Sequence, residues 1–416
     1  MASYSLVSTQ NRVESPFIVV QIGKYTFGHC AISEKTGNLT KVVHVDYPNY
    51  MEGLSIVKTN GAINTYTIRM VYAITENDDP NKLERVFSSV SDSRKLTLKY
   101  GDWNQPNYIY KDEEAIITKI SSNIDFMASK IKYTISCTSS ALALKSGVFN
   151  FSAKKAKPSE EIVKLLDDES YGLLNIFKGM RSSSSEKYAR FLEKDDRTVE
   201  IGEKRGISAF DYLGYLVKCM VSNTDNSSGL KKSNYYWSVY DDINNEYGGS
   251  YFRVKKVTAN TQYTISHDTY ELNIGYPSGE YITSFTVNND SSWALLYDYS
   301  EEVAQSKYVH HIDNNGKIVE TYSPKISSKT LTDNETNRTW WSQMTQFPIQ
   351  AKVVVKGLLR PAMLMSYVKI NSYFYGHKHV SSGLYIITKQ EDSIDGMGYK
   401  TTLSLTRLSG DTNMYE

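Results

Sequence analysis

His377 and His379 are the residue pattern in this chain that comes closest to metal chemistry. In a strand, both imidazoles would lie on one face, and Glu391 follows within a short distance in sequence. A protein metal site needs three or four ligands in fixed geometry, with supporting groups behind them. Gly376 and Gly383 bracket the pair and indicate an exposed turn, so the sequence predicts no metal site here.

Three carboxylates, Glu200, Glu203 and Asp211, are spaced closely enough to suggest a glycosidase pair, which would give a lysozyme-like activity. Spacing alone fixes no two-carboxylate geometry, and acidic residues at a solvated helix start are far commoner. The sequence contains no GxSxG elbow, HExxH motif or Walker A motif. We therefore predict a protein that is not an enzyme, with no catalytic, cofactor-binding or metal-binding residues.

Composition narrows the class of partner. The 416 residues carry 47 basic and 46 acidic side chains, for a net charge of +1, so no basic field favours nucleic acid. Tyrosine is common, at 33 residues, and this residue type is enriched in β-strands and in hydrated protein interfaces. Cys30, Cys137 and Cys219 lack CxxC spacing, and Cys137 is expected in a core. No signal peptide or membrane span is evident, which predicts a protein made in the cytosol without membrane insertion.

A repeated segment is the most informative feature of the sequence. IITKISSNIDFMASKIKYTISCTSS at 116–140 aligns without gaps with IITKQEDSIDGMGYKTTLSLTRLSG at 386–410, with nine identities. Tyr133 and Ile135 alternate with polar residues, as do Leu403 and Leu405. Strand side chains alternate between faces, so both copies are expected to bury the same face of a hairpin. Convergence of two unrelated amphipathic hairpins is the alternative.

The elements around the repeat predict a mainly β protein with an α+β insert. Residues 1–148 read as a first β domain, with an Asn60-Gly61 hairpin turn and one helix that starts at Asp79-Pro80. The apolar stripe of that helix is Leu83, Val86, Phe87 and Val90.

Residues 149–265 change in character and predict the α+β insert. Helices are expected from Pro158, with Ile162, Leu165, Leu166 and Leu173 buried, and from Ser208, with Leu213, Leu216, Val217 and Met220 buried. A strand is expected at 197–201.

Residues 266–416 predict a second β domain. Its expected strands are 270–273, 281–287, 293–299, 349–355, 367–374, 384–389 and 400–407. A long polar loop occupies about 300–339, and a loop of that length is usually functional.

Two stretches resemble known proteins. The runs TNGAINTYTIRMVYAI, DPNKLERVFSSV, KLTLKYGD, EEAIITKI and IKYTISCTSS, between Lys58 and Ser140, resemble tail-tube-type domains of bacteriophages. The segment from Trp340 to Asp411 resembles the C-terminal part of phage baseplate hub proteins. This resemblance implies two tail-tube-like β-barrel domains in one chain, in the baseplate of a virion tail assembled in the host cytoplasm.

The resemblance also implies partners. A homotrimer would present six tube-like barrels as a pseudo-hexameric ring that adapts the hexameric tail tube to the trimeric central spike. Genome DNA would pass through the lumen without specific binding. The chain ends at Glu416 without a spike domain, so the central spike or tail lysin is expected on a separate chain. Tape measure and baseplate wedge proteins are further expected partners. The alternatives are a tail-tube or distal-tail ring protein and a tail-associated peptidoglycan hydrolase.

Overall fold

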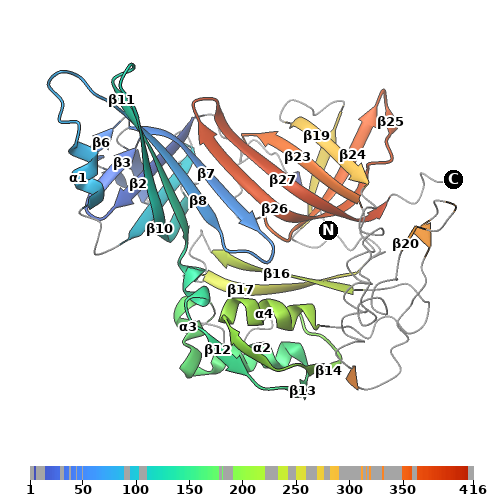
Figure 1. Ribbon diagram of the computed structural model, residues 1–416. Coiled ribbons are helices and arrows are strands. Elements are labelled where there is room, and N and C mark those ends of the chain that lie inside the picture. The colour runs from blue at the N-terminus through green and yellow to red at the C-terminus, as the bar shows by residue number, and fades with distance from the viewer. Residues whose placement is uncertain are drawn as a thin grey trace.

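Most of the residues that the structure describes are in β-strands, and most of the helices lie in the middle third of the chain (Figure 1). The computed structural model describes residues 4–5, 15–28, 32–36, 39–43, 45–48, 50–88, 94–102, 110–177, 180, 191–220, 233–241, 250–258, 269–275, 282–289, 311–312, 315, 318–319, 330–331, 349–357 and 363–410. The expected mainly β fold with an α+β insert is confirmed at this level. Expected features at Cys30, Val90, 293–299 and most of 300–339 lie outside the described residues.

The first half of the large sheet is built from strands that alternate buried and exposed side chains. β8, for example, buries Tyr66, Ile68, Met70 and Tyr72 along one face, which is the period-2 pattern of a half-buried strand. Its strands are β2 (Pro16–Ile22), β3 (Tyr25–Gly28), β6 (Tyr47–Pro48), β7 (Met51–Thr59), β8 (Thr65–Ala73), β9 (Lys95–Asp102), β10 (Tyr110–Asp125) and β11 (Lys130–Ser139). β4 (Ile32–Thr36) and β5 (Leu39–Val43) form a separate hairpin.

The short helix α1 (Lys82–Ser88) covers part of this sheet. Leu83, Val86 and Phe87 are buried, as their spacing predicts. The helix begins at Lys82 and not at the predicted Asp79-Pro80, because the Asp79 carboxylate accepts a hydrogen bond from the Asn81 amide and holds a turn ahead of it.

The Asn60-Gly61 hairpin is also longer than its sequence predicts. The last paired residues of β7 and β8 are Val57 and Thr65, and only Gly61 has a positive φ, of 67°. The connection is therefore not a two-residue turn. Its tip contacts the insert, where the Gly61 amide donates to the Trp237 carbonyl oxygen at 2.8 Å.

The insert combines short helices with small sheets. Its helices are α2 (Pro158–Asp167), η4 (Glu169–Tyr171), α3 (Leu173–Ile176) and α4 (Ala209–Lys218), preceded by η3 (Ser140–Lys145). Its strands are β12 (Phe149–Phe151), β13 (Lys154–Ala156), β14 (Thr198–Ile201), β15 (Lys204–Ile207), β16 (Ser233–Asp241) and β17 (Ser250–Thr258). Figure 1 shows β16 and β17 between α4 and the large sheet.

The helix predictions in the insert are confirmed by burial. Every apolar residue predicted for the two stripes is buried, although α2 ends at Asp167, so that Leu173 belongs to α3, and Met220 follows the end of α4. Ser208 caps α4 by accepting from the Asp211 amide at 3.1 Å, which satisfies an otherwise unpaired first-turn donor. No helix in the described part of the chain is long and apolar enough to cross a bilayer.

The second half of the large sheet comes from the C-terminal third of the chain. Its strands are β18 (Thr269–Ile274), β19 (Ile282–Asn289), β23 (Ile349–Lys356), β24 (Tyr367–Phe374), β26 (Gly383–Asp395) and β27 (Gly398–Gly410), joined by β25 (His377–Lys378) and the N-terminal β1 (Tyr4–Ser5). β1 pairs with β18 in parallel. Outside this sheet, β20 (His311–Ile312) pairs with β21 (Ile318–Val319), and β22 (Thr330–Leu331) pairs with β14.

Candidate functional site

The two repeated hairpins, β10–β11 and β26–β27, have the same irregularity at the same place. The register shifts between Ile117 and Lys119 in the first hairpin and between Ile387 and Lys389 in the second. The threonine at each bulge donates its hydroxyl to a carbonyl of the returning strand. Thr118 reaches the Ser136 carbonyl oxygen at 3.0 Å, and Thr388 reaches the Ser404 carbonyl oxygen at 3.2 Å. Bulges of this kind are specific features, so their coincidence favours duplication over convergence.

The ungapped alignment is wrong in the returning strand. Asp125 pairs with Lys130 across the first turn, whereas Asp395 pairs with Gly398 across the second, so the second turn is two residues shorter. With that gap, Lys132, Thr134, Ser136 and Thr138 coincide with the identical residues Lys400, Thr402, Ser404 and Thr406. Because two is an even number, the buried face is unchanged, and Ile135 and Leu403 are both fully buried.

Lys, Thr and Ser side chains occupy the face of each hairpin opposite the apolar residues. Thr134, Ser136 and Ser404 are half-buried, and so are not in a dry core. Thr402 and Thr406 are buried, with 8% and 4% of their surface exposed. The second hairpin is thus more covered than the first.

The similarity extends beyond the hairpins, because each hairpin belongs to a group of five strands with the same order. The first unit has the order β7-β8-β11-β10-β9, and the second unit has the order β19-β23-β27-β26-β24, with antiparallel pairing throughout. Beyond these strands the units differ, because β2 is antiparallel to β9 whereas β18 is parallel to β24. We call these the first and second units.

The two units are joined through a strand pair that we call the seam. β26 of the second unit pairs antiparallel with β7 of the first, from Lys389 opposite Thr59 to Ile394 opposite Leu54. Ile394 and Leu54 are 2% and 1% exposed. Ile394 and its hairpin partner Tyr399 belong to the apolar core of the first unit. The tip of the second hairpin therefore completes the core of the neighbouring unit, which no sequence pattern had indicated.

A buried polar cluster lies in the seam. The Asp392 carboxylate accepts from the Thr401 hydroxyl at 2.7 Å and from the Gln390 amide at 2.8 Å. The Gln390 side-chain oxygen accepts from the Met363 amide at 3.1 Å. Desolvation raises the pKa of Asp392 to about 6, although its hydrogen bonds and the Lys58 ammonium favour the ionised form. A carboxyl group without water near it resists ionisation.

Gly53 allows the close approach of strands at the seam. A Cβ at this position would lie 2.9 Å from the Ile394 carbonyl oxygen and 2.8 Å from the Arg69 guanidinium. We expect Gly53→Ala to lower the free energy of unfolding by about 1–3 kcal/mol, because backbone cannot yield as a flexible side chain can. Denaturant unfolding measures this. Gly396→Ala is the matched control, since a Cβ there meets nothing within 4 Å, and an equal loss in both variants would contradict the close approach.

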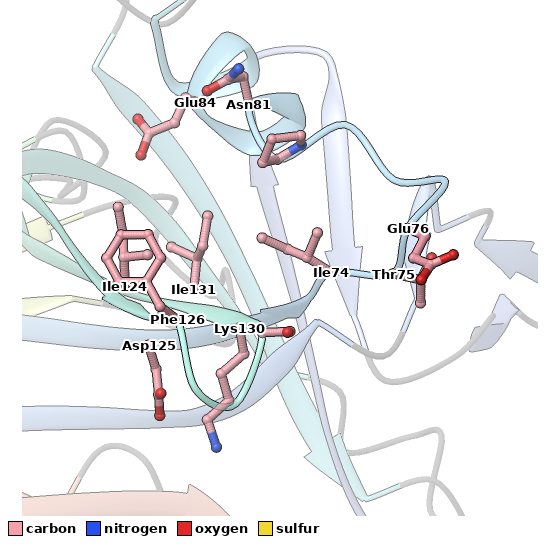
Figure 2. Close-up of a pocket in the computed structure, with 12 residues that line it drawn as sticks. Ile74, Thr75, Glu76, Asn81, Glu84, Ile124, Asp125, Phe126, Lys130 and Ile131 are labelled. Atoms are coloured by element: carbon pink, nitrogen blue, oxygen red, sulfur yellow. The ribbon is translucent and has the colours of Figure 1, made fainter.

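A cavity of about 750 Å³ opens at the tip of the first hairpin. Figure 2 shows Ile124, Phe126 and Ile131 of the hairpin directed toward α1 and the turn before it, which contribute Glu84 and Asn81 respectively. Ile124 is 51% exposed and Phe126 is 84% exposed. No periodic pattern predicts this apolar tip, and its only signal in the sequence is an isoleucine and a phenylalanine within a polar turn.

The residues considered for metal chemistry do not come together as a site. His377 is exposed, the His379 Nδ1 is 2.8 Å from the Ser381 hydroxyl, and Glu391 forms an ion pair with Lys389. Among the described residues, no group of three or more histidine, cysteine or acidic side chains is placed to hold a metal ion.

The carboxylates considered for glycoside hydrolysis each have a local partner. Glu200 pairs with Lys155 at 3.0 Å, and Glu203 pairs with Arg205 at 2.8 Å. Asp211 accepts from the Ser208 hydroxyl at 2.6 Å as part of the α4 cap. These contacts are those of surface ion pairs and a helix cap.

Cys137 lies in the core, as predicted, with 1% of its surface exposed. Burial raises the pKa of its thiol to about 12, so the reactive thiolate is not formed near neutral pH. Cys219 is also buried.

Comparison with known proteins finds similarity only among solved structures. No family model and no curated protein matches the sequence. The tail protein from Neisseria meningitidis MC58 has a TM-score of 0.49 at 10% identity, over 95% of this chain and 97% of that chain. The prophage MuSo2 43 kDa tail protein from Shewanella oneidensis has a TM-score of 0.47 at 10% identity, over 94% and 97%. An E. coli type VI secretion component, described as similar to T4 tail proteins gp27 and gp5, has a TM-score of 0.47 at 9% identity, over 89% and 76%. Two of these structures are named as tail proteins, and the third is described as similar to tail proteins.

Proposed function

We propose that this protein is a structural baseplate hub of a bacteriophage tail. Three chains form a ring of six similar units, which adapts a hexameric tail tube to a trimeric central spike and surrounds the channel for DNA. The seam carries this proposal. It joins two copies of one five-stranded unit edge to edge within a single chain, which is the contact that a ring of such units repeats.

The edges of the two units support a ring. In the described part of the chain, β19 pairs only with β23, and residues 119–125 of β10 pair only with β11. An unpaired strand edge is a template for a further strand. A head-to-tail contact between the two edges generates either a closed ring or an open filament. Three chains would close six units into a ring.

The polar face of the hairpins supports a channel lining. The Lys-Thr-Ser-Thr series of β11 recurs in β27, so a trimer would carry six copies of it, although in the second copy Lys400 and Ser404 retain exposed surface while Thr402 and Thr406 are buried. Hydroxyl groups and a net chain charge of +1 suit passage of DNA without specific capture. The channel, the tube protein above it and the spike or lysin chain below it are parts of the proposal, as are contacts with tape measure and wedge proteins.

The role proposed is non-enzymatic. The carboxylates that would serve a peptidoglycan hydrolase already have partners. Glu200 and Glu203 each form an ion pair, and Asp211 is part of a helix cap. Incubating the full chain with peptidoglycan should release no soluble fragments, and turnover that Glu200→Gln removes would contradict this part of the proposal.

Native mass spectrometry over a range of concentrations tests the proposal. We expect assembly to stop at three copies of the 47.2 kDa chain. A closed hexamer of whole chains would instead support a tail-tube or distal-tail ring protein and would contradict the trimeric hub.

A further inference from the structure

The two hairpin tips are equivalent in sequence and opposite in environment. Ile394 is 2% exposed because β7 lies beside it in the seam, whereas its counterpart Ile124 is 51% exposed. The next inward-facing position shows the same contrast, since Asp392 is buried and Ser122 is exposed. The second hairpin uses this edge and face to bind a neighbouring unit. In the first hairpin, the equivalent edge and face are exposed.

The strand that would cover Ile124 follows from the equivalence of the units. Leu54 pairs with Ile68 in the first unit, and Ile68 pairs with Ile135 of the hairpin. In the second unit, Leu403 is the counterpart of Ile135. It pairs with Val353, which pairs with Phe285 of β19. Phe285 thus occupies the place of Leu54, and β19 occupies the place of β7.

The outer strand of the second unit has the side chains that this contact needs. Phe285 and Val287 point to the core side of β19 but are only half-buried, whereas their counterparts Leu54 and Ile56 are each 1% exposed. Thr286 lies between them and is exposed. The half-buried apolar residues of the β19 edge and the open cavity beside Ile124 complement each other.

We propose that β19 of a second copy of this chain adds antiparallel to the tip of β10, with Phe285 opposite Ile124, Thr286 opposite Asn123 and Val287 opposite Ser122. The register is that of the seam carried over to the other edge. Phe285 packs against Ile124 at the mouth of the cavity between the hairpin and α1. This inference rests on the proposed ring and names the residues that close it.

The positions of the two edges fit contact between different chains. Figure 1 shows β10–β11 in the left half and β19 in the right half of the large sheet, with β8, β7, β26, β27 and β23 between them in strand order. They cannot meet within one chain that has this fold, but they can meet head to tail between neighbouring chains.

Cysteine cross-linking tests the register in the full chain. Asn123→Cys and Thr286→Cys replace exposed residues and leave the apolar face intact. Directly opposed residues in an antiparallel pair lie about 4.5–5.5 Å apart between Cα atoms, which a disulfide spans. Under mild oxidation, the double variant should form covalent species of two and three chains that a reductant disperses. Mixed single variants should give only the covalent dimer.

The out-of-register control pairs Lys119→Cys with Thr286→Cys. Lys119 is exposed and lies four residues from Asn123 along β10, roughly 13 Å away at strand spacing. It should cross-link at least about tenfold more slowly, because that separation exceeds the reach of a disulfide. Equal rates for the two pairs, or no cross-link at the highest attainable concentration, would overturn the inference.

A substitution series gives an independent measurement. Ile124→Asp should abolish assembly by native mass while circular dichroism and unfolding remain unchanged, since the side chain is exposed in the single chain. Met127→Asp, at a position 98% exposed and outside the cavity lining, is the matched control and should assemble normally. A trimer that persists in Ile124→Asp would reject this edge and leave the ring proposal standing. Cross-linked species of more than three chains would support the contact between β10 and β19 and reject the three-chain ring.

Discussion

Replacing Ile394 by alanine should lower the free energy of unfolding by about 2–5 kcal/mol, the usual cost of truncating a fully buried isoleucine. The side chain is 2% exposed and belongs to the core of the first unit, although it comes from the second. The same substitution at its repeat counterpart, Ile124, removes a side chain that is 51% exposed. Its cost to the isolated chain should be within about 0.5 kcal/mol.

Urea unfolding of the two variants, at concentrations where the chain is monomeric, measures this difference. The two variants control for each other, because both change an isoleucine at the equivalent position of the first strand of a hairpin. They differ in that a neighbouring unit covers Ile394 but not Ile124. Equal losses of stability would contradict the assignment of Ile394 to the neighbouring core. Loss of the seam should also split the unfolding of the two units into separate transitions, since their shared core is what couples them.

Asp392 should make the chain less stable as pH rises from about 4 to about 6. Its folded-state pKa, about 6, lies above the usual aspartate pKa of about 3.9. Between these values the folded state keeps a proton that the unfolded state has released, so stability falls with rising pH. The full stabilising contribution is present below the unfolded pKa and is lost above pH 6. At about 1.4 kcal/mol per pKa unit, the change is about 3 kcal/mol.

Asp392→Asn isolates this group from the other carboxylates. The amide keeps a polar partner for Thr401 and Gln390 and does not ionise. The variant and the natural chain should be equally stable near pH 4, and the variant should be more stable by about 3 kcal/mol above pH 7. A constant difference between Asp392→Asn and the natural chain across pH would contradict the assignment.

Local patterns predicted the elements well. The apolar stripes of α2 and α4, the Ser208 cap and the alternation of the repeated strands all depend on contacts within a few residues, which sequence periodicity reports directly. The predicted helix start at Asp79-Pro80 was two residues early, because an aspartate that caps a turn has the same sequence signature as one that caps a helix.

Long-range pairing was not predictable in the same way. Leu54 and Ile394 lie far apart in the chain, and each looks like an ordinary inward-facing residue of its own domain. The repeat contained a clue that the ungapped alignment concealed. Shortening the second turn by two residues preserves face parity, so the wrong alignment still looked right, while the aligned Lys-Thr-Ser-Thr series was hidden.

Cryo-electron microscopy of the purified assembly tests the central claim most directly, because symmetry conversion is visible in a single particle. The predicted particle is a ring of six similar β units with a protruding insert at every second unit, so that it has threefold symmetry and a sixfold outline. A ring of six complete chains, with an insert at every position, would contradict the account.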